Sequence, residues 1–251
     1  MAPSRATIIG TVAVLCFLAL WQVAPALHWV NGRFTSQPSL VALAAIDVLL
    51  HDDFFHHAGI SLAEFFLGFA LAILVSIPLG MLLGTSLLAR HLIDPPLMAL
   101  YMAPTLVLLP IMIVWLGIGM ASKVAVVFLG AIFPIVVNTV AGMREADQRL
   151  IRMAQAFGAN GVDVFWRVLV PGALPAFVTG LRLAVGRAVL GVIVGELFVS
   201  QAGIGYQLTT YGQAMRIDRL WVYALAVSAF GYGLTMAVRM LENRLKSWRP
   251  E

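Results

Sequence analysis

Three ionisable side chains interrupt one otherwise apolar stretch of the chain. Arg182, Arg187 and Glu196 all fall within residues 174–199. A charge in hydrocarbon is costly unless it faces protein or water, so each is a functional candidate by default. Arg182 is near one edge of the stretch and can extend its head group to the membrane surface. We expect Arg187 or Glu196 to face a polar path through the protein or a partner chain, and a structural bond to a neighbouring helix is the equally supported alternative.

Arg187 and Glu196 are not expected to pair with each other. They are nine residues apart, which corresponds to about 13 Å along a helix. A direct ion pair requires the two groups to approach within about 4 Å. Each therefore needs another partner, or an aqueous surface.

A second candidate site is the sequence HDDFFHH at residues 51–57. Imidazole and carboxylate groups are common metal ligands, so this stretch has the composition of a metal cluster. An exposed turn or an interfacial segment explains it equally well. We predict no metal site in the chain.

Catalytic signatures are missing from the sequence. A phosphate-binding loop needs Gly-x4-Gly-Lys-Ser/Thr, and neither of the two lysines, Lys123 and Lys246, stands in such a pattern. Within the apolar stretches, Ser76 and His91 are poor candidates for a hydrolytic site. We predict a non-catalytic chain without a cofactor, so any ATP hydrolysis that drives it takes place in another protein.

The composition indicates which elements position these residues. Hydrophobic residues make up 61% of the 251 positions and charged residues 11%, whereas soluble domains carry about 25% charged residues. The single cysteine, Cys16, excludes an internal disulfide framework. The net charge of +4 does not indicate nucleic acid, because the basic residues cluster at the edges of apolar runs.

Six apolar runs are long enough to span a bilayer, which requires roughly 20 residues per helix. We therefore predict an all-α integral membrane protein with one domain, residues 1–251. Arg90, His91 and Asp94 are expected to form the turn between the second and third spans. The first run also resembles a secretory signal, with Arg5 before it and Ala24-Pro25-Ala26 near its end. The expected spans are residues 6–27, 65–89, 95–118, 124–143, 174–199 and 220–238.

The distribution of basic residues predicts the orientation of the spans. Cytoplasmic loops carry an excess of lysine and arginine. If the N-terminus is cytoplasmic, the outer segments hold only Arg33, Lys123, Arg216 and Arg219. We therefore expect both termini, and the loop at 144–173, on the cytoplasmic side. The outer segment 28–57 is expected to contain an interfacial helix.

The loop at residues 144–173 is predicted to form two short helices. Asp147 can cap a helix that begins at Gln148, and Gly158 is a natural helix stop. Asn160-Gly161 predicts a turn, and a second amphipathic run is expected to end at Pro171. Helices this short need a surface to pack against. That surface is either the membrane itself or a groove on a cytoplasmic partner, whereas the flanking spans argue against a DNA-binding helix-turn-helix.

In this loop the sequence resembles the permease subunits of bacterial ABC importers, specifically the group that serves nitrate, sulfonate, taurine and related compounds. The pattern of that superfamily is Glu-Ala-Ala, three residues, Gly, nine residues, Ile-x-Leu-Pro. Gly158 and the segment 168–171 match it at the correct spacing. Arg152-Met153-Ala154 stands at its first three positions, so only the second alanine is kept. Further similarity is found at residues 61–84, 106–144, 179–188 and 202–206 and at Glu196, although Glu64 stands where a basic residue is usual.

The resemblance implies a type I importer permease in the bacterial inner membrane. Its expected partners are a second copy of the permease, a cytoplasmic ATPase dimer that binds ATP and magnesium, an external substrate-binding protein and membrane lipid. The solute would be small, and anionic or an organosulfur or nitrogen compound.

Transport would follow alternating access, coupled to the ATPase through residues 147–171, and Arg187 and Glu196 would face the path. An ion-gradient-driven transporter is the alternative, although the inverted repeats and intramembrane carboxylates typical of one are not evident. The coupling residues implied are Arg152, Met153, Ala154, Phe157, Gly158, Phe165, Val168 and Pro171.

Two pairs of glycines have the spacing that lets helices approach closely. These are Gly80 with Gly84, and Gly191 with Gly195. Both pairs are predicted to lie at helix contacts, within the chain or between two copies.

Overall fold

The computed structural model describes residues 5–103 and 105–246, and all regular structure in these ranges is helical. In this described part, five helices are long and apolar enough to cross a membrane, and the number is six if one bent pair of helices is counted as a single span. The five are α1 (Arg5–Ala26), α4 (Phe54–Thr85), α7 (Met120–Arg144), α10 (Val170–Val199) and α12 (Ile217–Lys246). The bent pair joins α5 (Leu87–Met102) to a 3-10 turn (Thr105–Leu108) and α6 (Leu109–Leu116), at an angle of 90°.

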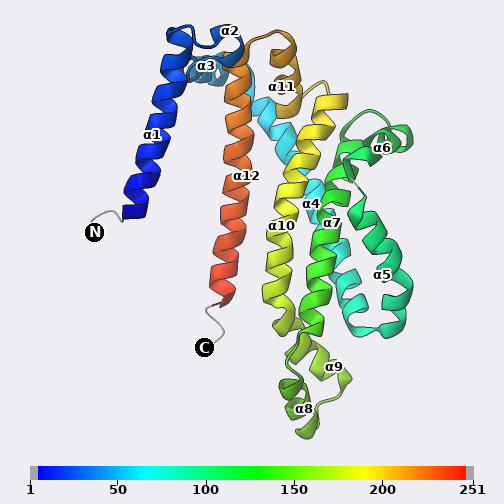
Figure 1. The fold of residues 1–251 in the computed structure, drawn as a ribbon. Coiled ribbons are helices and arrows are strands. Elements are labelled where there is room, and N and C mark those ends of the chain that lie inside the picture. Colours follow the sequence, from blue (N-terminus) through cyan, green and yellow to red (C-terminus); the bar gives the residue numbers. More distant parts are fainter. Residues whose placement is uncertain (1–4, 104, 247–251) are drawn as a thin grey trace.

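Shorter helices gather at the two ends of the bundle (Figure 1). α2 (Gly32–Thr35), α3 (Pro38–His51) and α11 (Ile204–Gln213) lie at one end, here called the α3 end. α8 (Gln148–Ala156) and α9 (Gly161–Val164) lie at the other, the α8 end. The described start of α1 and the described end of α12 both point toward the α8 end.

The second and third spans differ from the expected ranges 65–89 and 95–118. α4 begins at Phe54 and so includes Glu64, the charge that set the lower bound of the expected span. Glu64 is buried inside the protein, so its charge does not end the helix. The turn between the spans lies at Ser86, whose side chain accepts a hydrogen bond from the Ala89 amide and caps α5. The expected turn at Arg90, His91 and Asp94 is therefore wrong, since these residues lie in α5.

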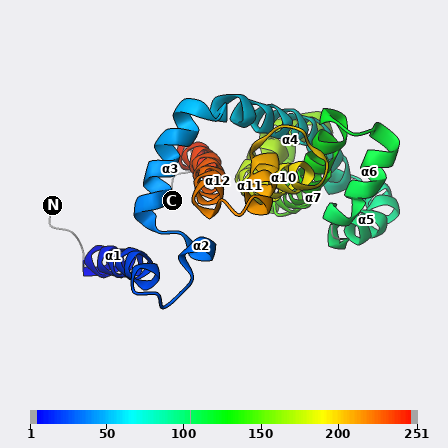
Figure 2. The ribbon, with the colours of Figure 1, turned by 90° about the horizontal axis from the view of Figure 1, so that it is seen from above.

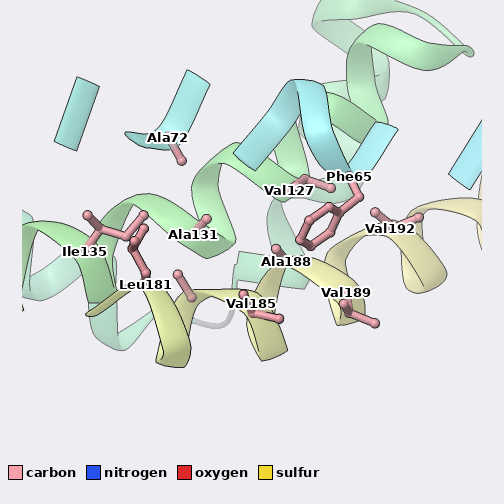
Figure 3. Packing of buried hydrophobic residues seen from close by; sticks show 11 residues of the cluster. Phe65, Ala72, Val127, Ala131, Ile135, Leu181, Val185, Ala188, Val189 and Val192 are labelled. Atoms are coloured by element: carbon pink, nitrogen blue, oxygen red, sulfur yellow. The ribbon is translucent and has the colours of Figure 1, made fainter. Parts of the chain in front are cut away.

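α7 is the central helix of the bundle, with α4 and α10 packed along it (Figure 2). The core between these three helices contains Phe65 and a series of small or β-branched side chains (Figure 3). Ala72, Ala131, Ala184 and Ala188 are fully buried there. Small side chains bring helix backbones close together, which is the usual way to pack helices where lipid supplies no hydrophobic driving force.

α1 stands away from this bundle in both views (Figures 1 and 2). Its contacts with the rest of the chain are concentrated near its end, where Trp21 packs against Trp221 with 4.9 Å between ring centroids. The indole of Trp21 also donates a hydrogen bond to the Thr35 carbonyl. The remainder of α1 presents exposed apolar side chains, such as Phe17 and Leu20, as a lipid-facing helix does.

α3 crosses the α3 end of the bundle and is held there by Arg219 of α12. The Arg219 guanidinium donates to Asp52 Oδ1 at 2.9 Å and also pairs with Asp47. Tyr211 of α11 donates to the same Asp52 carboxylate. Burial, assisted by this hydrogen bond, raises the pKa of Tyr211 above its usual value, so the phenol remains a donor. A helix is therefore present within residues 28–57, where the sequence predicted one, and it is tied to two other helices.

Candidate coupling and translocation sites

The local signals at the α8 end produce the first predicted helix as expected. The Asp147 carboxylate accepts a hydrogen bond from the Arg149 amide at 2.8 Å and caps α8. α8 ends at Ala156, and Gly158 follows with φ +84°, a conformation that a side chain rarely adopts. Asn160, expected to form a turn, caps α9 in a reciprocal pair of hydrogen bonds with Asp163.

The second helix of the loop does not end at Pro171, contrary to the prediction. α9 continues through a π-helical turn, Phe165–Leu169, directly into α10. Proline lacks an N–H donor and normally breaks a helix. At the beginning of α10, the wider π turn accommodates this loss without ending the helix. The loop is thus one separate helix, α8, followed by an extension of α10.

The apolar side of α8 is left uncovered. Phe157 is 85% exposed and Met153 is 51% exposed. Beside them, between α8 and the beginning of α10, lies a mostly apolar cavity of about 610 Å³. Its lining includes five of the predicted coupling residues: Met153, Ala154, Phe157, Val168 and Pro171. Exposed apolar surface of this kind marks an interaction site.

The other three predicted coupling residues lie around this cavity without lining it. Arg152 and Gly158 are exposed, and Phe165 is partly buried in the π turn against Trp166. A side chain on Gly158 would meet no atom within 4 Å. The backbone conformation of this residue, and not a lack of space, therefore favours glycine.

Arg187 and Glu196 have different surroundings in the structure. Arg187 is exposed on α10, and its guanidinium carbon lies 4.5 Å from the centre of the Tyr101 ring of α5. This contact is a cation–π interaction, which fixes the charge while leaving guanidinium edges available. Within the described residues, the printed partner of Arg187 is thus an aromatic ring and not a carboxylate.

Glu196 is 1% exposed and holds the turn between α10 and α11. Its carboxylate accepts hydrogen bonds from Ser61 Oγ at 2.5 Å and from the Gly205 amide at 2.6 Å. Gly203, with φ +116°, lies so close that an added Cβ would be 2.2 Å from Glu196 Oε1. In this structure Glu196 makes the bond to a neighbouring helix that the sequence left as the alternative.

Sequence reasoning missed most of the polar residues around Glu196. Ser61 Oγ also accepts a hydrogen bond from the Ile204 amide at 2.9 Å, and His57 Nδ1 accepts one from the Gly203 amide at 3.1 Å. Lys123 pairs with the buried Glu64. The available signal was Glu64 itself, a charge at the edge of an apolar run that needed a partner.

The stretch HDDFFHH is divided among separate contacts instead of meeting at one point. His51 pairs with Asp47 at 3.1 Å, while Asp52 binds Arg219. His57 faces the α10–α11 turn. Over the described residues, no group of three potential ligands comes together.

Both glycine pairs lie at contacts within the chain. A Cβ on Gly80 would be 2.6 Å from Thr139 Cβ, and one on Gly84 would be 2.6 Å from Met143 Cβ. On the other side of α7, a Cβ on Gly191 would be 3.3 Å from Val127 Cα, and one on Gly195 would be 3.1 Å from Lys123 Cγ. These distances place the pairs where α4 and α10 touch α7.

Comparisons with known proteins agree with this architecture. The chain is 30% identical to the taurine transport system permease protein TauC of Escherichia coli (strain K12), over 97% of this chain and 90% of that protein. It is 32% identical to the formylaminopyrimidine transport permease protein ThiX of Halalkalibacterium halodurans, over 95% of each.

Solved structures show the same fold. A chain of the inward-facing MetNI methionine ABC transporter superposes with a TM-score of 0.64 and 19% identity, over 76% of this chain and 95% of that one. An amino acid ABC transporter gives a TM-score of 0.61 with 14% identity, over 77% of this chain and 92% of that one.

A family model covers the part of the chain that contains the central helices and the α8–α9 loop. It spans residues 76–247 and is described as the inner membrane component of binding-protein-dependent transport systems. The helical fold, the multiple membrane spans and the absence of a catalytic signature fit that description. This chain belongs to the family of inner membrane permease components of binding-protein-dependent ABC transport systems.

Proposed function

We propose that this chain forms, with a second identical copy, the translocation path of an importer for a small anionic or organosulfur or nitrogen-containing solute. An ATPase and a binding protein are partners of this permease family. The proposed assembly has two ATPase chains, which bind ATP and magnesium, at the α8 end and one binding protein at the α3 end.

The observation that carries this proposal is the uncovered apolar side of α8 beside the 610 Å³ cavity. A membrane surface could also cover such an apolar face. However, α8 lies beyond the ends of the long helices α7 and α10 and not alongside them (Figure 1). A groove on the ATPase that receives α8 accounts for both the apolar surface and this projection.

Charge supports placing the α8 end in the cytoplasm, with both termini on that side. Basic residues concentrate there, whereas the α3 end holds few. Those at the α8 end, within the described ranges, are Arg5, Arg90, Arg144, Arg149, Arg152, Arg167, Arg239 and Arg244.

Arg187 is the proposed contact for an anionic solute on the path. It is exposed, in the middle part of a membrane-spanning helix, and Tyr101 fixes its position without neutralising its charge. Glu196 is proposed to hold the α10–α11 turn and not to bind the solute, since its carboxylate accepts hydrogen bonds from Ser61 and Gly205. Taurine, the solute in the name of a relative, is the first compound to test.

The test uses the chain reconstituted in vesicles with the ATPase and the binding protein encoded beside its gene. ATP-dependent uptake of taurine is compared with uptake of a formylaminopyrimidine. Gly158→Val strains the backbone after α8 and is expected to reduce uptake at least tenfold while ATP hydrolysis continues.

Gly161→Val is the matched control for that experiment. Gly161 is also exposed and has open space around it, but its backbone is helical. Uptake by this variant should remain close to that of the original chain. Equal uptake by the Gly158 and Gly161 variants would contradict the proposed coupling, and uptake driven by an ion gradient without ATP would contradict the importer assignment.

A further inference from the structure

Two carboxylates and one ammonium group meet in the protein interior near the α3 end. Glu64 of α4 and Glu196 of α10 are each 1% exposed, and Lys123 of α7 is 5% exposed. Lys123 pairs with Glu64 and also donates to Ser200 Oγ at 3.0 Å. The cluster is separate from the α8 surface and from Arg187, so it does not depend on the function proposed above.

The hydrogen bonds of the two carboxylates leave one oxygen unused. Both oxygens of Glu196 accept bonds, from Ser61 and from the Gly205 amide. Glu64 Oε1 faces Lys123, whereas Glu64 Oε2 is buried and has no donor among the described residues. Ser61, which binds Glu196, lies three residues before Glu64 on α4, so Glu64 and Ser61 face the same side of that helix, toward Glu196. An orphaned buried oxygen next to a second carboxylate is costly unless a proton lies between them.

Among the residues that the structure describes, the groups around these three side chains provide no second positive charge. His57 of α4 accepts the Gly203 amide through Nδ1, so that nitrogen carries no proton. His56 is exposed and stacks edge-on against His57, and Asp52 and Asp53 add only negative charge. α11 contributes Gln207, which is neutral and contacts His57. Two carboxylates thus face one ammonium.

We propose that Glu64 and Glu196 form a proton-binding site, in which the two carboxyl groups share one proton. With this proton the cluster has one carboxylate and one ammonium, and it is electrically neutral. Like charges in contact inside a protein do not both ionise, and the proton belongs to the pair and not to one residue. Glu64 is the determining residue, because a basic side chain at its position would already balance Glu196.

A cavity gives this site access to the α3 side. It has a volume of about 640 Å³, and Glu64, Lys123 and Ser200 line it together with His56, which is exposed. A proton can therefore exchange with the solution at that end. Loss of the proton would place a second negative charge beside Glu196, which holds the α10–α11 turn, and would loosen that turn.

Infrared spectroscopy of the purified full-length chain in lipid vesicles tests the site directly. A buried protonated carboxyl group has a C=O stretch distinct from that of a carboxylate. We expect one such band that disappears as the pH is raised. Both Glu64→Gln and Glu196→Gln should abolish it, because a single remaining carboxylate is balanced by Lys123 and needs no proton.

Glu242→Gln is the control, since Glu242 is another buried carboxylate but pairs with Arg182 at 3.1 Å. This variant should keep the band. The proposal is overturned if the band is absent from the folded original chain at every pH, or if it survives in either glutamate variant. Survival in one variant alone would show a proton held by a single residue and not by the pair.

Discussion

The two ends of the bundle differ in which side chains they bury and which they expose. At the α3 end, charged residues such as Lys123, Glu64 and Glu196 are buried, and each makes polar contacts within the chain. At the α8 end, apolar residues such as Phe157 are exposed without a partner in the described part of the chain. The α3 end therefore satisfies most of its polar groups within the chain, whereas the α8 end leaves an apolar surface uncovered, as the proposed docking of the ATPase requires.

The largest effect is expected from breaking the buried ion pair at the α3 end. Lys123→Met leaves Glu64 and Glu196 without a cation, which should lower the free energy of unfolding by about 3–5 kcal/mol. The matched change at the α8 end is Arg167→Met, because Arg167 pairs with Asp163 at 3.5 Å but is 80% exposed. That change should cost less than about 0.5 kcal/mol. Thermal unfolding in detergent measures both, and equal losses would remove the contrast between the two ends.

The next effect concerns Gly203, where the turn between α10 and α11 touches Glu196. Gly203→Ala combines an unfavourable φ with a severe clash and should cost roughly 2–4 kcal/mol. Gly117→Ala provides the control, because Gly117 also has positive φ, at +79°, but nothing within 4 Å of its added Cβ. Only the strain remains there, about 1 kcal/mol. Similar unfolding temperatures for the two variants would show that the contact with Glu196 contributes little.

A smaller effect on stability is expected at Arg187, which lies between the two ends. Arg187→Gln removes the interaction with the Tyr101 ring and should cost about 0.5–1 kcal/mol. In the transport assay, the same change should raise the KM for an anionic solute more than it lowers kcat, since the lost group binds the solute in every state. A change in kcat alone would indicate that Arg187 serves the conformational cycle instead.

The smallest effect on stability should come from the exposed face of α8. Phe157→Ser removes an apolar side chain that is already in water, so the free energy of unfolding should stay within about 0.5 kcal/mol. Co-purification of the ATPase should nevertheless fall, because the docking face has lost its most exposed apolar group. An unchanged yield of ATPase would place the docking surface elsewhere.

The sequence predicted those parts of the molecule that local signals determine. The cap at Asp147 and the stop at Gly158 depend on hydrogen bonds within a few residues, and both are confirmed. The end of the second helix at Pro171 was wrong, because a π turn absorbed the proline. The expected second span was placed after Glu64, whereas α4 begins before it. A charge can lie within such a helix when a residue distant in the sequence, here Lys123, pairs with it.

The cluster around Glu196 was beyond local inference. Ser61 lies 135 positions from Glu196 in the sequence, and His57 meets Gly203 only because α4 and α10 both pack on α7. Such contacts require the packed bundle. In the sequence, the traces of the cluster were Glu196, a charge within an apolar run, and Glu64, a charge at the edge of one.

The continuity of α9, the π turn and α10 has a mechanical consequence. From Gly161 to Phe198 the chain is a single helical rod of 38 residues, about 57 Å long. A displacement applied beside α8 would therefore be passed along one continuous helix to the residues just before the α10–α11 turn. Force from one side of the membrane can reach the other through a single element, and the π turn near its base is the place where that helix can twist.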